Sequence, residues 1–232
     1  MSALAVPSTA GAATGRNLAG LASRLWKLIV SGAEHIPVDG PVILAANHTA
    51  FLDGILLAAA STRPVHVLAP SGIFVPPIDR LMRATSQISL DYDATDRAGL
   101  RQALSVLAAG GVIGIFPESV RGAGDAQHLR HQAAYLACHS GSPVVPVAIL
   151  GSRPAGAGKD ALPRMRSAVY VVFGEAVDIA VDGDSRRRAV IARSGERLRQ
   201  ALSDHVSEAV SRTGQDLPGP LPLTTSDHRS TP

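Results

Sequence analysis

The stretch AANHTAFLD, from Ala45 to Asp53, organises the chain. The residues before it, 42–46, form an apolar run typical of a buried strand, and the residues after it, 55–58, form an apolar helical run. Positions i and i+5 lie far apart around a straight helix, so His48 and Asp53 can meet only if His48 occupies the turn before the helix. An aspartate bonded to one imidazole nitrogen fixes the tautomer and makes the other nitrogen a base.

Composition narrows the class of protein. The 232 residues are 46% hydrophobic and 3% aromatic, with a net charge of +3, which predicts one globular domain and argues against a stacking surface for nucleic acid. Cys138 is the only cysteine, which excludes an internal disulfide, and we expect it in the core. No run reaches the roughly 18 apolar residues of a membrane-spanning helix.

The order of apolar runs and turn signals predicts strands alternating with helices. Strands are expected at 42–46, 65–69, 88–90, 112–116, 144–150 and 168–173, and helices after Asp53, at 95–109 with Thr95 as cap, at 126–139 and at 185–212. This alternation indicates a single α/β domain with a mostly parallel central sheet flanked by helices.

The two ends of the chain receive separate predictions. We expect residues 1–14 and 213–232 to be disordered, 15–31 to form an amphipathic helix, and 32–212 to form the folded domain. The helix carries leucines on one face, basic residues elsewhere and Trp26, a pattern that suits either a membrane interface or packing on its own domain. The arginines at 186–188 are either a solvated face or a contact for anionic lipid.

Three more motifs stand in order after His48 and Asp53. They are Phe116-Pro117-Glu118-Ser119-Val120-Arg121, Val144-Val145-Pro146-Val147 and Val172-Phe173-Gly174-Glu175. Together with the HX4D pair they resemble the glycerolipid acyltransferase superfamily over roughly 32–175. The resemblance implies that His48 is the base on an acceptor hydroxyl and that Asp53 orients it.

The same resemblance implies the rest of the reaction. The donor would be acyl-CoA or acyl-carrier protein, and the acceptor a lysolipid at the cytoplasmic membrane face, foremost 1-acyl-sn-glycerol-3-phosphate, giving phosphatidic acid. It implies peripheral membrane association, no cofactor, no metal and no nucleic acid. The residues expected to bind substrate are Asn47, Phe116, Pro117, Glu118, Ser119, Arg121, Val145 and Pro146.

Roles within that set remain open at this point. Arg121 suits a phosphate because guanidinium pairs with two oxygens, and Glu118 would hold Arg121 or the acceptor glycerol, unless the two form an ordinary structural pair. This chain departs from the family at Ser119-Val120, where Gly-Thr is usual, and at Tyr92, where an arginine is usual. A different arginine could then serve the phosphate, from among Arg80, Arg83 and Arg97. Another lysolipid or a glycolipid acceptor, a non-catalytic lipid binder and a thioesterase are the alternatives.

Overall fold

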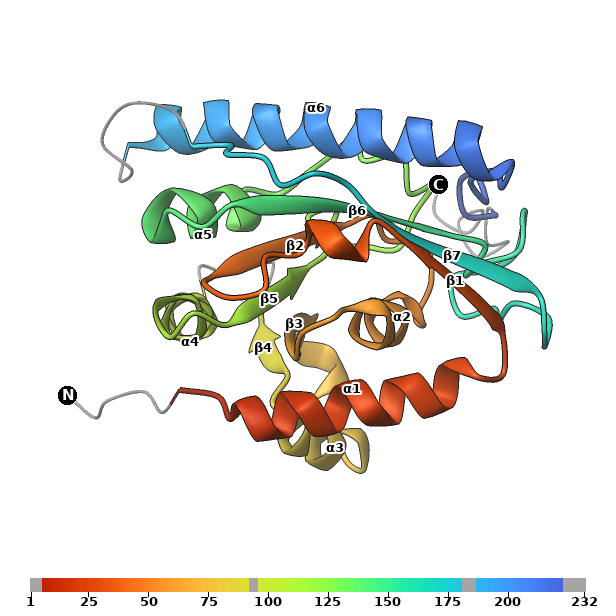
Figure 1. The fold of residues 1–232 in the computed structure, drawn as a ribbon, viewed down its shortest axis with the longest axis horizontal. Coiled ribbons are helices and arrows are strands. Elements are labelled where there is room, and N and C mark those ends of the chain that lie inside the picture. Colours follow the sequence, from red (N-terminus) through yellow and green to blue (C-terminus); the bar gives the residue numbers. More distant parts are fainter. Residues whose placement is uncertain (1–5, 92–95, 181–186, 223–232) are drawn as a thin grey trace, which may run out of the picture.

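A computed structural model describes residues 6–91, 96–180 and 187–222 of the chain. In these residues a seven-stranded sheet has the order β1-β7-β6-β2-β5-β3-β4 (Figure 1). The strands are β1 (Lys27–Ser31), β2 (Val42–Ala46), β3 (Val65–Pro70), β4 (Ile88–Leu90), β5 (Val112–Ile115), β6 (Val144–Leu150) and β7 (Ala168–Phe173). All neighbouring pairs are parallel except β6 and β7, as the alternating pattern predicts.

Helices cover both faces of this sheet. They are α1 (Thr9–Ser23), α2 (Asp53–Ala60), α3 (Ile78–Ala84), α4 (Arg97–Ala108), α5 (Gln132–Ser140) and α6 (Arg188–Thr213), with short 3-10 turns η1 (Ala33–His35) and η2 (Ser71–Ile73). Figure 1 places α6 above the sheet, and α2 and α1 below it. The α2 helix packs on the sheet and α1 packs on α2, whereas α4, α5 and α6 pack on the other face.

The central strand shows why the apolar runs fold this way. Successive side chains of a strand point to opposite faces, and the β2 residues are all buried. Val42, Leu44 and Ala46 join the core beneath α2, while Ile43 and Ala45 join the core beneath α4 and α5. A strand buried on both faces must be apolar at every position, which explains the unbroken run.

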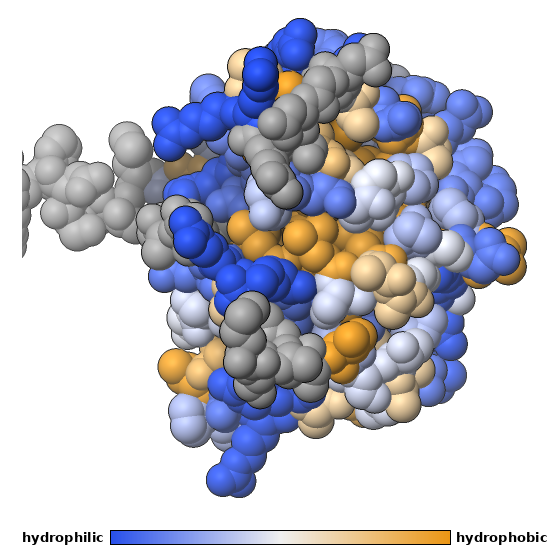
Figure 2. All heavy atoms as spheres, turned by 90° about the vertical axis from the view of Figure 1, so that its left-hand side faces the viewer, coloured by the Kyte–Doolittle hydropathy of each residue, from blue (hydrophilic) through white to orange (hydrophobic). Residues whose placement is uncertain are grey.

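The parallel direction of the central strands brings several loops together at one edge of the sheet. Because β2, β3, β5 and β6 run parallel, their carboxyl ends meet at one edge of the sheet. The turn 47–52 and the loops 116–131 and 151–167 therefore leave the sheet side by side. The opposite edge, where these strands begin, faces the viewer in Figure 2, with apolar residues in the middle of the face and hydrophilic ones around them.

The amino-terminal prediction is wrong in its boundaries. Instead of a helix over 15–31, α1 spans Thr9–Ser23 and is capped by Ser8, whose hydroxyl accepts from Gly11 N–H at 3.3 Å. Residues 27–31 form the edge strand β1, parallel to β7. Part of the stretch expected to be disordered is thus helical, and residues 1–5 lie outside the described part.

Small residues explain how α1 sits so close to its neighbours. A side chain at Gly11 would collide with Ser86, and one at Gly15 would press against Thr85. The apolar leucines that suggested an amphipathic helix are largely exposed, at 48% for Leu18, 60% for Leu21 and 48% for Leu25. The helix therefore packs through its small residues and presents its leucines outward.

Other boundaries also shift. The helix expected over 126–139 begins only at Gln132, and 116–131 is a long loop. Thr95 lies outside the described residues, and Asp96 caps α4 by accepting from Ala98 and Gly99 N–H.

The carboxyl-terminal prediction changes in the same way. Residues 214–222, expected to be disordered, pack on the folded domain. Leu217 packs beside α6, and the Gly219 carbonyl accepts from Arg153. Residues 223–232 are not described. Cys138 belongs to α5 and is partly buried; its thiol donates to the Ser194 hydroxyl of α6 at 3.2 Å, so it lies at a contact between two helices and not in the core.

Candidate active site

His48 and Asp53 meet at the carboxyl end of β2. The imidazole Nδ1 lies 2.9 Å from Asp53 Oδ2, with His48 on the turn and Asp53 as the first residue of α2. The same Oδ2 accepts from Thr49 N–H at 2.7 Å and Ala50 N–H at 2.8 Å. Three donors on one oxygen hold that oxygen in place. Because a carboxylate only accepts, Nδ1 carries the proton and Nε2 keeps its lone pair.

The burial of the two groups differs in a useful way. The Asp53 side chain is fully buried, whereas 15% of the His48 side chain is exposed. Helix N-termini favour negative charge, so the first position of α2 is a suitable place for a buried carboxylate. The arrangement leaves part of the imidazole exposed and buries the carboxylate that is bonded to it.

Phe116 and Pro117 follow β5, and Phe116 packs against His48. The Phe116 ring stacks on the His48 imidazole, with ring centroids 4.3 Å apart and planes inclined by 28°. The Pro117 carbonyl accepts from Arg130 N–H at 2.8 Å, which fixes the loop behind it. Both residues were expected to bind substrate, and the structure shows them holding the imidazole and the loop.

Glu118 contacts the backbone of the histidine itself. Its Oε2 accepts from His48 N–H at 2.6 Å and its Oε1 from Ala126 N–H at 3.0 Å. Burial raises the pKa of Glu118 to about 7, with smaller contributions from Asp125 and Asp53, while the two N–H groups act in the opposite direction. The carboxyl group is thus largely shielded from solvent at the turn 47–52, and none of the ion pairs found among the described residues involves it.

Arg121 turns away from Glu118. Its Nη1 donates to Asp160 Oδ1 at 2.6 Å and to the Lys159 carbonyl at 3.2 Å, both in the loop 151–167. The pairing of Glu118 with Arg121, left open by the sequence, is therefore not formed. The Arg121–Asp160 pair is exposed, so solvent weakens it.

Ser119 explains one departure from the family pattern. Its φ is +59°, in the left-handed region that glycine enters freely and that costs other residues about 1–2 kcal/mol. The family's usual glycine suits this turn, and the serine here adopts the same backbone.

Asn47 ties three segments together. Its amide donates to the Gly124 carbonyl at 3.1 Å and the Ile149 carbonyl at 3.2 Å, and its oxygen accepts from Ile149 N–H at 2.7 Å. The residue is completely buried. It was expected to bind substrate, but all of its polar atoms serve to join the catalytic turn to β6 and to the loop 116–131.

Val145 and Pro146 lie inside the sheet. They belong to β6, between β2 and β7, and both are buried. The Pro146 carbonyl accepts from Gly174 N–H at 2.8 Å, and Pro146 stands opposite Ala45 in the ladder. Because both side chains are buried, a contact with substrate at this motif could come only from the backbone.

Arg153 is a site residue that the sequence did not reveal. Only 2% of it is exposed, and its guanidinium donates to the carbonyls of Ala157 at 2.6 Å, Gly122 at 2.9 Å and Gly219 at 2.6 Å. Burial lowers its pKa and nearby Asp53 opposes that shift. Beside it, the hydroxyls of Ser152 and Thr49 lie 2.9 Å apart. Its place in a Gly/Pro-rich loop gave no local sign of burial.

The alternative arginines are all exposed. Arg83 lies over the Phe74 ring, 5.9 Å from its centroid, while Arg80 is on α3 and Arg97 begins α4. Tyr92 lies outside the described residues, so the structure does not bear on its place in the second motif.

Apolar side chains surround this edge of the domain. Those exposed on the segments that follow the carboxyl ends of the strands are Phe51, Val75, Ile78, Leu81, Val120, Leu162 and Met165.

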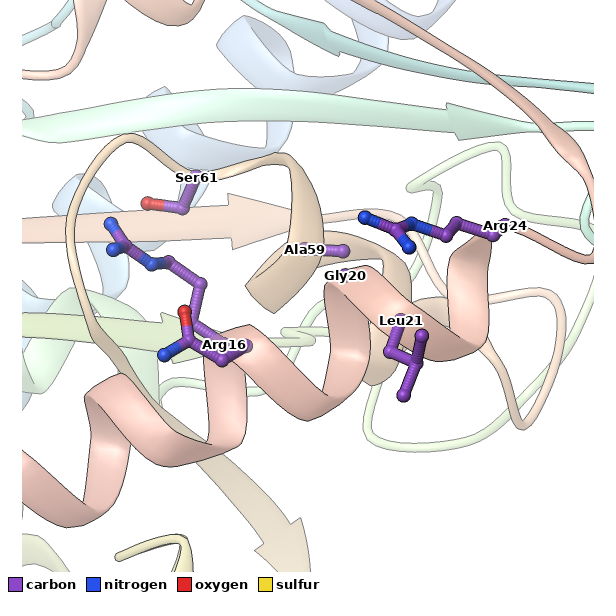
Figure 3. A pocket seen from close by; sticks show the side chains of 7 residues that line it. Arg16, Gly20, Leu21, Arg24, Ala59 and Ser61 are labelled. Atoms are coloured by element: carbon purple, nitrogen blue, oxygen red, sulfur yellow. The ribbon is translucent and has the colours of Figure 1, made fainter.

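A groove of about 400 Å³ runs between α1 and the end of α2, with Arg16 and Arg24 projecting over it (Figure 3). Arg16 donates to the Thr62 carbonyl at 2.8 Å. None of the helices described is both long and apolar enough to span a bilayer.

The fold and site define an α/β domain with a partly exposed histidine bonded to a buried aspartate at the carboxyl edge of a mostly parallel sheet. A family model described as Acyltransferase matches residues 27–150, and the chain belongs to this family.

Individual relatives agree with that assignment. The chain is 28% identical over 133 residues to a 1-acyl-sn-glycerol-3-phosphate acyltransferase of Borreliella burgdorferi, covering 54% of this chain and 53% of that protein. It is 29% identical over 133 residues to a protein of the same description from Chlamydomonas reinhardtii, with 55% and 40% covered. The chain thus spans about half the length or less of these relatives.

A solved structure matches over more of the chain. The 1-acyl-sn-glycerophosphate (LPA) acyltransferase of Thermotoga maritima superposes with a TM-score of 0.66 at 22% identity, covering 88% of this chain and 79% of that one. This likeness supports the α/β fold derived above.

Proposed function

We propose that the protein transfers a fatty acyl group from a thioester to a lysolipid hydroxyl, with His48 as general base. Nε2 takes the hydroxyl proton, and the hydroxyl oxygen attacks the thioester carbonyl. The carbon–sulfur bond then breaks, and the thiolate leaves with the proton returned by the imidazolium. The products are an ester and a free thiol. The observation that carries the proposal is the 2.9 Å contact of a partly exposed imidazole with a fully buried carboxylate.

Asp53 supports both halves of this cycle. It holds the tautomer that leaves Nε2 free, and its negative charge stabilises the imidazolium that forms when the acceptor loses its proton. The Phe116 stack restricts rotation of the ring. A base held in one orientation avoids the entropy loss that a mobile side chain would suffer in the transition state.

The acceptor that the relatives favour is 1-acyl-sn-glycerol-3-phosphate, since the Borreliella and Chlamydomonas proteins carry that description. Arg121 is the proposed phosphate contact, because its guanidinium can exchange the exposed Asp160 carboxylate for a phosphate of higher charge. Another lysolipid or glycolipid acceptor is the alternative, and it would leave Arg121 paired with Asp160.

We place the reaction at a membrane surface, because both substrates carry acyl chains. The exposed leucines of α1, the apolar residues around the carboxyl edge and the cations Arg16 and Arg24 would together suit a peripheral contact with anionic lipid (Figure 3). The acyl-CoA or acyl-carrier-protein donor would approach from the aqueous side.

The test is a substrate panel with the product identified by mass. Purified protein on lipid vesicles receives labelled acyl-CoA or acyl-carrier protein with one acceptor at a time. The acceptors are lysophosphatidate, other lysophospholipids, a glycolipid, and none. Acylation of lysophosphatidate to phosphatidic acid, at a rate well above the acylation of the other acceptors, supports the proposal. Free fatty acid released at the same rate without any acceptor identifies a thioesterase and overturns it.

A further inference from the structure

The loop 116–126 holds the peptide backbone of His48 from two sides. Glu118 Oε2 accepts from His48 N–H at 2.6 Å, and Gly122 N–H donates to the His48 carbonyl at 3.0 Å. Asp53 holds the ring of the same residue and Phe116 stacks on it. The backbone contacts come from a segment 70 residues away, so the position of the histidine depends on this loop as much as on its own helix.

Glu118 also closes its own loop. The second carboxylate oxygen accepts from Ala126 N–H at 3.0 Å, eight residues further on. Both oxygens are therefore engaged with backbone donors, and Arg121, the nearby cation of the motif, binds Asp160 instead. These contacts differ from both roles that the sequence allowed, which were to hold Arg121 and to bind the acceptor glycerol.

We propose that Glu118 is a positioning residue for His48, whose ionised carboxylate fixes the catalytic turn against the loop 116–126. The proposal rests on His48 being the base of the proposed function. A carboxylate can accept from both N–H groups at once, whereas a protonated carboxyl has one full acceptor fewer. Protonation of Glu118 therefore releases one of the two contacts and loosens the turn.

The surroundings place this change near neutral pH. The charged and titratable groups around the carboxylate are His48 of the turn, Asp53 of α2 and Asp125 of its own loop. Burial, aided by these two aspartates, raises the pKa of Glu118 to about 7. Arg153 binds the Gly122 carbonyl of the same loop and does not contact the carboxylate through any of its three bonds.

The first experiment needs no substrate. The amide proton of His48, in a 2.6 Å contact with a carboxylate, should resonate far downfield in the NMR spectrum of the full chain. We expect Glu118→Gln to move this resonance upfield and to remove the part of its pH dependence, centred on about pH 7, that comes from Glu118. A His48 amide shift that does not change across pH 6–8 would overturn the proposal, and this result does not depend on the reaction catalysed.

The second experiment uses steady-state kinetics. Glu118→Gln keeps one acceptor and replaces the other with an amide NH2, so we expect kcat to fall by about 10- to 100-fold, as for a small misplacement of a catalytic group. The acceptor KM should change by less than about twofold. The acid limb of kcat should lose the contribution of Glu118.

The matched control is Glu196→Gln, which removes an exposed carboxylate paired with Arg199 on α6. It should leave kcat and its pH profile unchanged. An unchanged kcat with a strongly raised acceptor KM in Glu118→Gln would show that Glu118 binds the acceptor and would refute the positioning role. If the variant does not fold, the position of the His48 amide resonance in the unmodified protein still tests the contact, because an ordinary amide shift would exclude it.

Discussion

Replacing Asp53 with asparagine separates the charge of this residue from its shape. The Oδ2 position accepts from Thr49 N–H and Ala50 N–H as well as from His48 Nδ1, so an amide NH2 cannot occupy it without facing two donors. The amide oxygen must therefore take that place and keep the productive tautomer. An asparagine that turned its NH2 toward Nδ1 would stabilise the other tautomer, and the two backbone donors prevent this orientation.

The expected loss follows from the missing charge. A unit charge pair at about 4 Å is worth about 4 kcal/mol at an effective dielectric constant of 20. A charged hydrogen bond also exceeds a neutral one by about 1 kcal/mol. Allowing for solvent at the exposed side of His48, we expect the barrier to rise by about 2–4 kcal/mol, which is a fall in turnover of about 30- to 900-fold.

Stability should decrease less than this. Asp53 Oδ1 is buried and has no hydrogen-bond partner among the described residues, so the amide NH2 placed there would be unsatisfied. That costs about 1–3 kcal/mol out of a typical 5–15 kcal/mol. The variant should fold, and circular dichroism and thermal unfolding will check it.

The assay is turnover at saturating donor and acceptor, with Asp178→Asn as control. Asp178 is an exposed aspartate that accepts from Ala180 N–H. It follows β7, which is antiparallel to β6 and therefore ends at the edge of the sheet opposite His48. In Ser-His-Asp enzymes, an asparagine that holds the histidine in the wrong tautomer lowers turnover by roughly 10⁴-fold. A loss of that size here would refute our placement of the amide oxygen. A loss below about threefold would refute a role for the charge.

Three further results are expected. Arg121→Ala should raise the acceptor KM by about 10-fold or more and leave the donor KM nearly unchanged. Asp160→Asn should lower the acceptor KM, because it frees Arg121 from its ion pair. An equal rise in the KM of both substrates in Arg121→Ala would indicate a structural arginine. Because the pKa of Glu118 is raised to about 7 in the folded state and has its ordinary value of 4.5 in the unfolded state, the free energy of unfolding should fall as pH rises between these values. Chemical denaturation should show that fall in the unmodified protein and its absence in Glu118→Gln, and equal pH dependence in both would contradict the assignment. Replacing Leu18 and Leu21 of α1, and Leu25 just after it, with serine should weaken binding to anionic vesicles while unfolding is little changed, since these side chains are exposed. Unaltered vesicle binding would exclude this segment as the contact. Deletion to residue 31 is unsuitable for that last test, because it removes β1.

The central strands and the base pair were predictable because their signals are local. A strand buried on both faces reads as an unbroken apolar run, and β2, β5 and β6 all have this form. The geometry of a turn before a helix was enough to bring His48 and Asp53 together. Both inferences needed only residues within a few positions of one another.

The errors arose where a distant partner decides the structure. Lys27–Ser31 is a strand because Ala168–Phe173 lies beside it, about 140 residues later, and nothing in its own five residues distinguishes it from the end of a helix. Asn47 is held by Ile149 and Gly124 in the same way. Side chains such as Arg121 and Glu118 could be assigned to the site from their motif, but their partners could not.

The measurement that tests the central claim most directly is the single-turnover rate of acyl transfer in His48→Ala. Loss of a general base should lower that rate by about two to four orders of magnitude while circular dichroism remains that of the unmodified protein. The control is His139→Ala, a histidine in the last turn of α5, the helix that leads into the beginning of β6 at the far edge of the sheet. We predict that only the His48 variant loses transfer. A folded His48→Ala protein that transfers acyl groups at a near-normal rate would contradict the account.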